Sequence, residues 1–253
     1  MGGSPKTKKK AAARPVVIAK LHAPRLASAI PRARLFKRLD TDLRRGRIVW
    51  VTAPAGAGKT TLAAGYTAAC TSKHLWFQFD PRDADPATFF YYLREAAAQI
   101  SSRARRVLPL LTPEYAFGLG TYTRNFFEQL GALLKSPRLL VFDNYHELPD
   151  DAPVHALLAE GLQALPESIN VLVLSRNDPP PAFAGLQAGR RLAAFDASLL
   201  ALTLPETRAL ARRYRFARLT PEVIASLRDR TRGWTAGAIL ILEEAAEGHV
   251  VAP

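Results

Sequence analysis

Residues 48 to 62 read Ile48-Val49-Trp50-Val51-Thr52-Ala53-Pro54-Ala55-Gly56-Ala57-Gly58-Lys59-Thr60-Thr61-Leu62, an apolar run followed by small residues and then Gly-Lys-Thr-Thr. The apolar, β-branched part predicts a strand, and the part after Gly58 predicts the start of a helix. A strand and a helix joined by such a loop form a phosphate-binding P-loop, in which backbone N–H groups and the positive end of the helix surround an anion. The sequence therefore predicts nucleotide binding.

Within this loop, the ammonium of Lys59 is expected to reach the β- and γ-phosphates, and the hydroxyl of Thr60 to bind Mg²⁺. The predicted nucleotide contacts are the loop residues Ala53, Pro54, Ala55, Gly56, Ala57, Gly58, Lys59, Thr60 and Thr61. The usual pattern begins with a glycine, and Ala53 can replace that glycine if its φ angle is negative. The alternative is a glycine-rich turn in which Lys59 is only solvated.

The composition is that of a folded globular protein, because 48% of the 253 residues are hydrophobic and 23% are charged. The single cysteine, Cys70, excludes an internal disulfide framework and cysteine-rich metal sites. The sequence lacks both an apolar run of the ~18 residues that a membrane helix needs and the apolar core of a signal peptide. We expect a cytoplasmic protein with no membrane contact.

The formal net charge is +13, and residues 1–15 contribute strongly to it through a cluster of lysines. This segment is low in complexity and predicts a disordered basic tail. The charge is compatible with an anionic partner such as nucleic acid, or with a solvated tail on an arginine-rich protein. The scattered arginines and the absence of a helix-turn-helix, zinc-finger or RNA-binding aromatic pattern favour the second interpretation.

Strands and helices are predicted to alternate along the chain after the P-loop strand. Further strands are expected at 74–80, 138–144, 170–176 and 192–196. Helical patterns lie at 34–43, 60–70, 86–101, 123–135 and 154–164. Apolar strands that alternate with helices indicate an α/β fold, with a parallel sheet covered by helices on both faces.

The strand pattern stops after Leu200. Three short helices are predicted there, at 205–215, 221–230 and 234–247. We therefore expect a nucleotide-binding domain over residues 16–200 and a small helical domain over residues 201–253, which is either compact or the beginning of a longer arrangement.

Asp143 ends the apolar run Leu139-Leu140-Val141-Phe142. Ligands of α/β sheets bind at the carboxyl ends of the strands, so Asp143 is the predicted Walker B acid that holds Mg²⁺ together with Thr60. The alternative is an aspartate that caps a turn.

Related ATPases often carry a second acid at the position after the Walker B aspartate, but this chain has Asn144, whose amide can orient a water molecule and cannot take its proton. With Glu147 as the nearest carboxylate in sequence, we expect slow or partner-dependent hydrolysis.

Ser175 and Arg176 stand at the end of another predicted strand, Val171-Leu172-Val173-Leu174. A guanidinium at a strand tip that faces the γ-phosphate could distinguish ATP from ADP by pairing with the additional charge. The predicted catalytic residues are therefore Lys59, Asp143, Asn144 and Arg176. The alternative is a surface arginine before the turn at Asp178.

Several blocks of this sequence together resemble the ATPase domain of the large ATP-binding transcriptional regulators of the LuxR type, the group like the maltose-regulon activator. The blocks are KLHAPR with IPRARL, APAGAGKTTL, LWFQFDPRDADPATFFYYL, LLVFDNYHEL, VLVLSRNDPP and RTRGWTAG. These regulators belong to the signal-transduction ATPases with numerous domains (STAND). The resemblance runs from about Val16 to Gly248.

The resemblance implies an ASCE-type P-loop sheet with strand order 5-1-4-3-2, followed by a small helical region. It implies contact of Ile30, Pro31 and Arg32 with the adenine. It also implies a switch in which ADP holds a resting form, while ATP and an inducer of unknown identity favour self-association. DNA would be bound only through domains that this chain does not contain, and Asn144 departs from the second aspartate of many relatives.

Two other functions remain compatible with the residues. One is a P-loop kinase that phosphorylates a small molecule, which would need a base at the acceptor site and an arginine-rich lid. The other is a basic nucleic-acid-binding protein, whose salt-dependent binding should survive deletion of residues 1–15.

Overall fold

The computed structural model describes residues 18–26, 29–70, 74–115, 117–134, 138–214, 216 and 219–246. The predicted basic tail at residues 1–15 lies outside the described residues. None of the helices in the described part of the chain combines the length and the apolar character that crossing a membrane requires.

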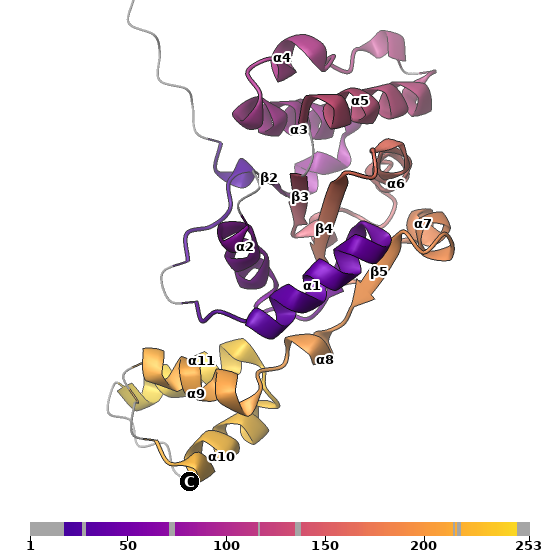
Figure 1. Cartoon of the computed structure of the whole chain (residues 1–253). Helices are drawn as coiled ribbons and strands as arrows, with labels where there is room; N and C mark the ends of the chain where they lie inside the picture. The colour runs from indigo at the N-terminus through magenta and orange to yellow at the C-terminus, as the bar shows by residue number, and fades with distance from the viewer. Residues whose placement is uncertain are drawn as a thin grey trace, which may run out of the picture.

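Five parallel strands form one sheet at the centre of the molecule (Figure 1). The strands are β1 (Ile48–Thr52), β2 (His74–Gln78), β3 (Arg138–Asp143), β4 (Ile169–Ser175) and β5 (Leu192–Phe195). Their order is β2-β3-β4-β1-β5, which is the predicted order 5-1-4-3-2 read from the other edge. Because β4 lies between β1 and β3, the ASCE-type P-loop fold is confirmed.

Helices cover both faces of this sheet. The covering helices are α1 (Ala33–Gly46), α2 (Lys59–Ala69), α3 (Pro86–Ile100), α4 (Ala104–Val107), α5 (Leu119–Leu134), α6 (Val154–Ala164) and α7 (Ala184–Ala188). Figure 1 shows α3 and α5 above the sheet and α1 below it. The fold therefore has three layers, with the sheet between two layers of helices.

Alternating strand residues supply the two cores. Trp50 of β1 and Phe77 of β2 pack in a cluster with residues of α3, α5 and α6. Val49 and Val51 pack on the opposite face, in a cluster with residues of α1 and α2. Both faces are buried, which explains why the strands are almost continuously apolar.

The helices expected from the sequence are present with shifted ends, and three short α-helices among the described residues were not predicted. Helix α1 extends to Gly46 and α5 begins at Leu119, whereas the sequence pattern predicts 34–43 and 123–135. The unpredicted helices are α4, α7 and α8 (Ala197–Leu200). Each has five residues or fewer, which is too short to show a helical period in the sequence.

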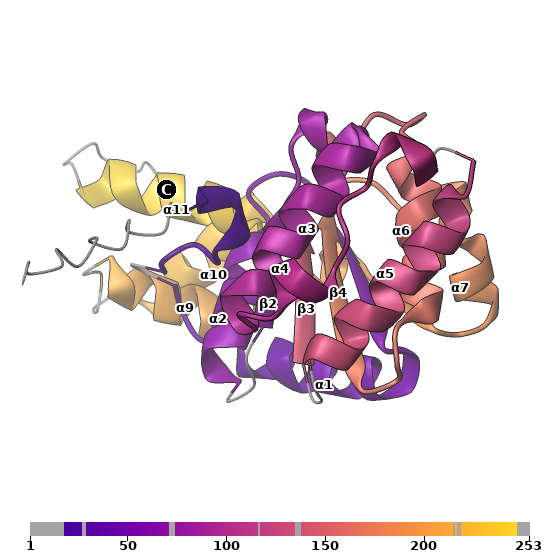
Figure 2. The same cartoon turned by 90° about the horizontal axis from the view of Figure 1, so that it is seen from above.

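A separate group of helices follows β5 and α8. It consists of α9 (Leu204–Arg213), α10 (Pro221–Thr231) and α11 (Thr235–Ala246), and we call it the helical region. Leu202, Leu210, Ile224 and Leu242 are among the residues of its own hydrophobic cluster. Figure 2 shows these helices gathered to one side of the sheet. A division into two domains near residue 200 remains our proposal.

Helices α5 and α6 cross closely, and two glycines permit it. A Cβ on Gly161 would lie 2.3 Å from Cδ2 of Phe127, and a Cβ on Gly131 would lie 2.4 Å from Cδ of Pro166. Real Cβ atoms do not approach carbon atoms so closely, so α5 fits against α6 at Gly161, and against the segment that follows α6 at Gly131, only because both positions lack a side chain.

We predict that Gly161→Ala lowers the free energy of unfolding by about 1–3 kcal/mol, because the new methyl group overpacks the contact with Phe127. Gly185→Ala in α7 is the matched control, since its Cβ would have only Gln163 within reach, at 3.9 Å. Urea denaturation measures both. Equal stability of the two variants would contradict the close crossing of α5 and α6.

Candidate functional site

The P-loop joins the carboxyl end of β1 to the first turn of α2. Gly56 and Gly58 have φ angles of 72° and 90°, a backbone conformation that disfavours other residues. Ala53 is buried and is not among the residues with positive φ, so alanine fits where the usual pattern has glycine. The first N–H groups of α2 have no partner within the helix and are available to an anion.

Lys59 begins α2 and is held over the loop. Its Nζ donates hydrogen bonds to the carbonyl oxygens of Ala53 (2.5 Å) and Pro54 (3.0 Å). Burial lowers the pKa of Lys59, the positive charge of Arg176 lowers it further, and Asp143 opposes both effects. The ammonium therefore lies in surroundings that a negative ligand would stabilise.

Thr60 and Asp143 meet across the loop. The Thr60 hydroxyl lies 3.1 Å from both carboxylate oxygens of Asp143. Burial raises the pKa of Asp143, while hydrogen bonds from Thr60 and the Asn144 N–H and the charge of Lys59 oppose the rise. A buried carboxylate beside a hydroxyl at a phosphate-binding loop offers the hard oxygen ligands that Mg²⁺ prefers, so these residues fit the metal.

Asn144 follows Asp143 in a left-handed turn. Its φ angle is 54°, and its backbone N–H donates to Asp143 Oδ1 at 2.9 Å. Asn144 thus begins the short 3₁₀ helix Tyr145–Glu147 at the carboxyl end of β3. Its predicted role in orienting water stays a prediction.

Ser175 and Arg176 end β4 next to the P-loop, because Ser175 pairs with Thr52 in the parallel register. The Ser175 hydroxyl is buried and accepts a hydrogen bond from the Asn177 N–H at 3.0 Å. Arg176 is exposed, and its guanidinium makes no hydrogen bond or ion pair with any described residue. Arg176 and Lys59 are like charges close enough to affect each other, an arrangement that a phosphate between them would relieve.

A cavity of about 490 Å³ opens between α2, the helical region and residues 25, 26 and 29–32, which we call the N-terminal segment. Its size is typical of a small-molecule site. The predicted adenine contacts Ile30, Pro31 and Arg32 all line it, together with Gly58 and Thr61. Sequence reasoning missed the rest of its lining, which includes Arg25, Leu26, Phe36, Leu210, Tyr214, Thr235 and Ile239.

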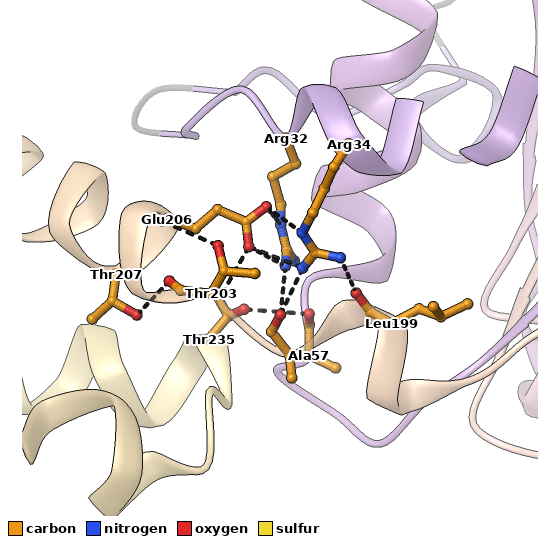
Figure 3. A network of polar contacts seen from close by, with 9 residues as sticks. Arg32, Arg34, Ala57, Leu199, Thr203, Glu206, Thr207 and Thr235 are labelled. Carbon is orange, nitrogen blue, oxygen red and sulfur yellow. Dashed lines mark hydrogen bonds and ion pairs between the residues drawn. The ribbon is translucent and has the colours of Figure 1, made fainter. Parts of the chain in front are cut away.

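Arg32 does more than line the cavity, because it also ties the N-terminal segment to the helical region (Figure 3). Its guanidinium donates to Glu206 at 3.1 Å and to the carbonyl oxygen of Ala201 at 3.1 Å. Arg34 donates to the same carboxylate at 2.9 Å and to the carbonyl oxygen of Leu199 at 2.9 Å. Burial raises the pKa of Glu206, but the hydrogen bonds from the two arginines outweigh it and hold the pKa at about 2.

The helical region also contacts the P-loop itself. Trp234 Nε1 donates to the carbonyl oxygen of Ala55 at 2.9 Å, and the Ala236 N–H donates to that of Gly56 at 3.0 Å. The Thr235 hydroxyl donates to the carbonyl oxygen of Ala57 at 3.4 Å, a contact drawn in Figure 3. We call these three hydrogen bonds the P-loop clasp. Apart from the Gly-Trp block, no sequence pattern indicates this clasp, since its acceptors are backbone carbonyl oxygens.

The sequence profile of the family described as Nephrocystin 3, N-terminal, matches residues 29–176. This range contains the P-loop, Asp143 and Arg176, and it ends before the helical region.

Curated relatives include two proteins named HTH-type transcriptional regulator MalT. The protein from Serratia proteamaculans is 29% identical over 227 residues, and the protein from Klebsiella pneumoniae is 30% identical over 231 residues. Each alignment covers 89% of this chain and 25% of the relative. The chain therefore spans about a quarter of the length of these relatives.

A solved structure with a similar fold is a signal transduction ATPase with numerous domains (STAND) from Pyrococcus horikoshii, which carries a tetratricopeptide repeat sensor. The TM-score is 0.62 at 18% identity, over 91% of this chain and 32% of that one. This likeness shows the fold. The MalT relatives confirm the resemblance to LuxR-type ATP-binding regulators that the sequence motifs indicated.

We predict that Glu206→Gln lowers the free energy of unfolding at pH 7 by about 2 kcal/mol, because the pKa of Glu206 falls from 4.5 to about 2 on folding and solvent screening reduces the roughly 3.4 kcal/mol that this fall represents. The lowered pKa means that this stability is present above pH 4.5 and is lost as the pH falls toward 2. Urea denaturation at pH 7 and pH 3 measures it. The difference between wild type and variant should shrink at pH 3, whereas the exposed control Glu244→Gln should show none at either pH.

Proposed function

Because the chain belongs to the family of the nephrocystin 3 N-terminal domain, we propose that it is a regulatory ATPase module that binds ATP and ADP. The observation that carries this proposal is the meeting of Lys59, Thr60 and Asp143 at the carboxyl edge of the sheet. A phosphate chain on the P-loop would lie beside the ammonium of Lys59, and the cavity would take the adenine and ribose.

Mg²⁺ would be held by the Thr60 hydroxyl and by Asp143, in part through water. When bound, the ion would neutralise charge on the β- and γ-phosphates. Ionised Asp143 is costly while buried, and a neighbouring cation would offset that cost. Arg176 would contact the γ-phosphate from the end of β4.

The proposed output is conformational. The P-loop clasp attaches the helical region to the loop that would hold the phosphates, so a change at the phosphates would reach α11 through Ala55, Gly56 and Ala57. A ligand shifts such an equilibrium only by its difference in affinity for the two states, and a few kcal/mol suffice. This suits a switch in which ADP favours the arrangement seen here and ATP favours an opened, self-associating form.

Hydrolysis would be slow or would depend on a partner, because Asn144 replaces the acid that polarises water in many related ATPases. The name of the MalT relatives includes transcriptional regulation, and we propose a role of this kind for the protein that contains this chain. An inducer would act, and DNA would bind, through parts of the protein beyond these residues. A cytoplasmic location is proposed on the same basis.

The first test is Lys59→Ala, which should weaken the binding of ADP and of Mg-ATP at least tenfold, because it removes the charge that faces the phosphates. Isothermal titration calorimetry measures the affinities, and a thermal melt checks that the variant folds. Lys37→Ala, at an exposed position of α1, is the control that removes an equal charge. Unchanged affinity in Lys59→Ala would contradict nucleotide binding at the P-loop.

A second test addresses the P-loop clasp. Trp234→Phe removes the hydrogen bond to Ala55, so bound ADP should dissociate about 2–10 times faster, in line with the net value of one hydrogen bond. Stopped-flow release of a fluorescent ADP analogue measures the rate. Leu240→Ala is the control, because Leu240 lies exposed on α11, the helix that directly follows Trp234. Identical rates in both variants would show that the clasp does not restrain the nucleotide.

A further inference from the structure

His146 is an unexplained buried polar group beside the P-loop. Its side chain is only 8% exposed, and neither ring nitrogen makes a hydrogen bond to any described residue. Nε2 lies 3.4 Å from Glu147 Oε1, close enough to orient the ring without forming a well-aligned hydrogen bond. A buried polar group without a hydrogen bond costs free energy, which suggests that a ligand supplies its partner.

The position of His146 is fixed by its neighbours along the chain. The left-handed turn at Asn144 directs Tyr145 into the core, where its hydroxyl is 2.7 Å from His155 Nδ1. His155 Nε2 is in turn 2.8 Å from the carbonyl oxygen of Pro149, and the Tyr145 ring packs edge-on against Trp50. This buried network holds the 3₁₀ helix at the carboxyl end of β3 and so places the imidazole beside the site.

Charged groups of the nucleotide site act on the imidazole. Burial lowers the pKa of His146, the positive charges of Arg176 and Lys59 lower it further, and Glu147 opposes them. Lys59 comes from α2, Arg176 from the end of β4, and His146 from the turn after β3, so three elements converge. The ring stays neutral at pH 7, with one N–H to donate and no added charge to desolvate.

We propose that His146 is a specificity-determining residue that hydrogen-bonds the γ-phosphate of ATP, alongside Arg176, with Glu147 orienting the imidazole ring. The inference rests on the proposed function, because it takes the nucleotide to lie on the P-loop with its terminal phosphate between Lys59 and Arg176. ADP lacks the γ-phosphate, so it leaves the imidazole without this partner. His146 therefore contributes to the preference for ATP and hardly affects the binding of ADP.

The test compares two ligands in the full chain, ADP and the hydrolysis-resistant ATP analogue adenylyl imidodiphosphate, both with Mg²⁺ and both measured by calorimetry. His146→Ala should weaken binding of the ATP analogue about tenfold and change ADP affinity less than twofold. His146→Gln, which keeps an N–H donor, should recover part of the loss. His74→Ala, at the opposite end of the sheet in the first position of β2, should change neither affinity.

Every other outcome would overturn a specific part of the proposal. Equal losses for both ligands would show that His146 only supports the fold of the site, and unchanged affinities would show that it makes no contact. A wild-type chain that binds ADP but gains nothing from the γ-phosphate would overturn the role of His146 and leave nucleotide binding intact. If the wild type bound neither ligand, the proposed function itself would fail.

Discussion

Three hydrogen bonds from the start of α11 to consecutive carbonyl oxygens of the P-loop join the two parts of this molecule. Trp234, Thr235 and Ala236 supply the donors, and Ala55, Gly56 and Ala57 supply the acceptors. The clasp requires very close approach, since a Cβ on Gly56 would lie 2.5 Å from the Cβ of Ala236. The carbonyl oxygens of the loop thus bind the helical region, while its N–H groups are available to phosphates. We therefore propose that movement on either side affects the other.

Several polar groups of the site carry an unfavourable free energy in the free protein. Lys59 and Arg176 repel each other, buried Asp143 has a raised pKa, and His146 lacks a hydrogen-bond partner. Each of these costs would be reduced by a magnesium-bound phosphate chain. Groups that are costly in the free protein and satisfied by a ligand are typical of binding sites.

The second attachment of the helical region runs from Arg32 and Arg34 to Glu206 and involves no residue of the P-loop. It holds the helical region beside the cavity.

The fold could be predicted from the sequence because its signals are local. The apolar strands and the Gly58-Lys59-Thr60 turn each report their own structure. Thr60 and Asp143 were also predicted to meet. The P-loop clasp could not be predicted, because carbonyl groups carry no sequence signal. His146 was missed because its significance comes from burial and from charges on two distant segments, Lys59 and Arg176.

If the nucleotide and the helical region act on the same loop, nucleotide binding should be felt at the backbone N–H of Ala236, because that N–H donates to Gly56. Hydrogen–deuterium exchange measures this. Saturating Mg-ADP should slow the exchange of this N–H together with that of the P-loop, while α5, on the far side of the sheet, is unchanged. Protection of the P-loop without any change at residues 234–238 would contradict it.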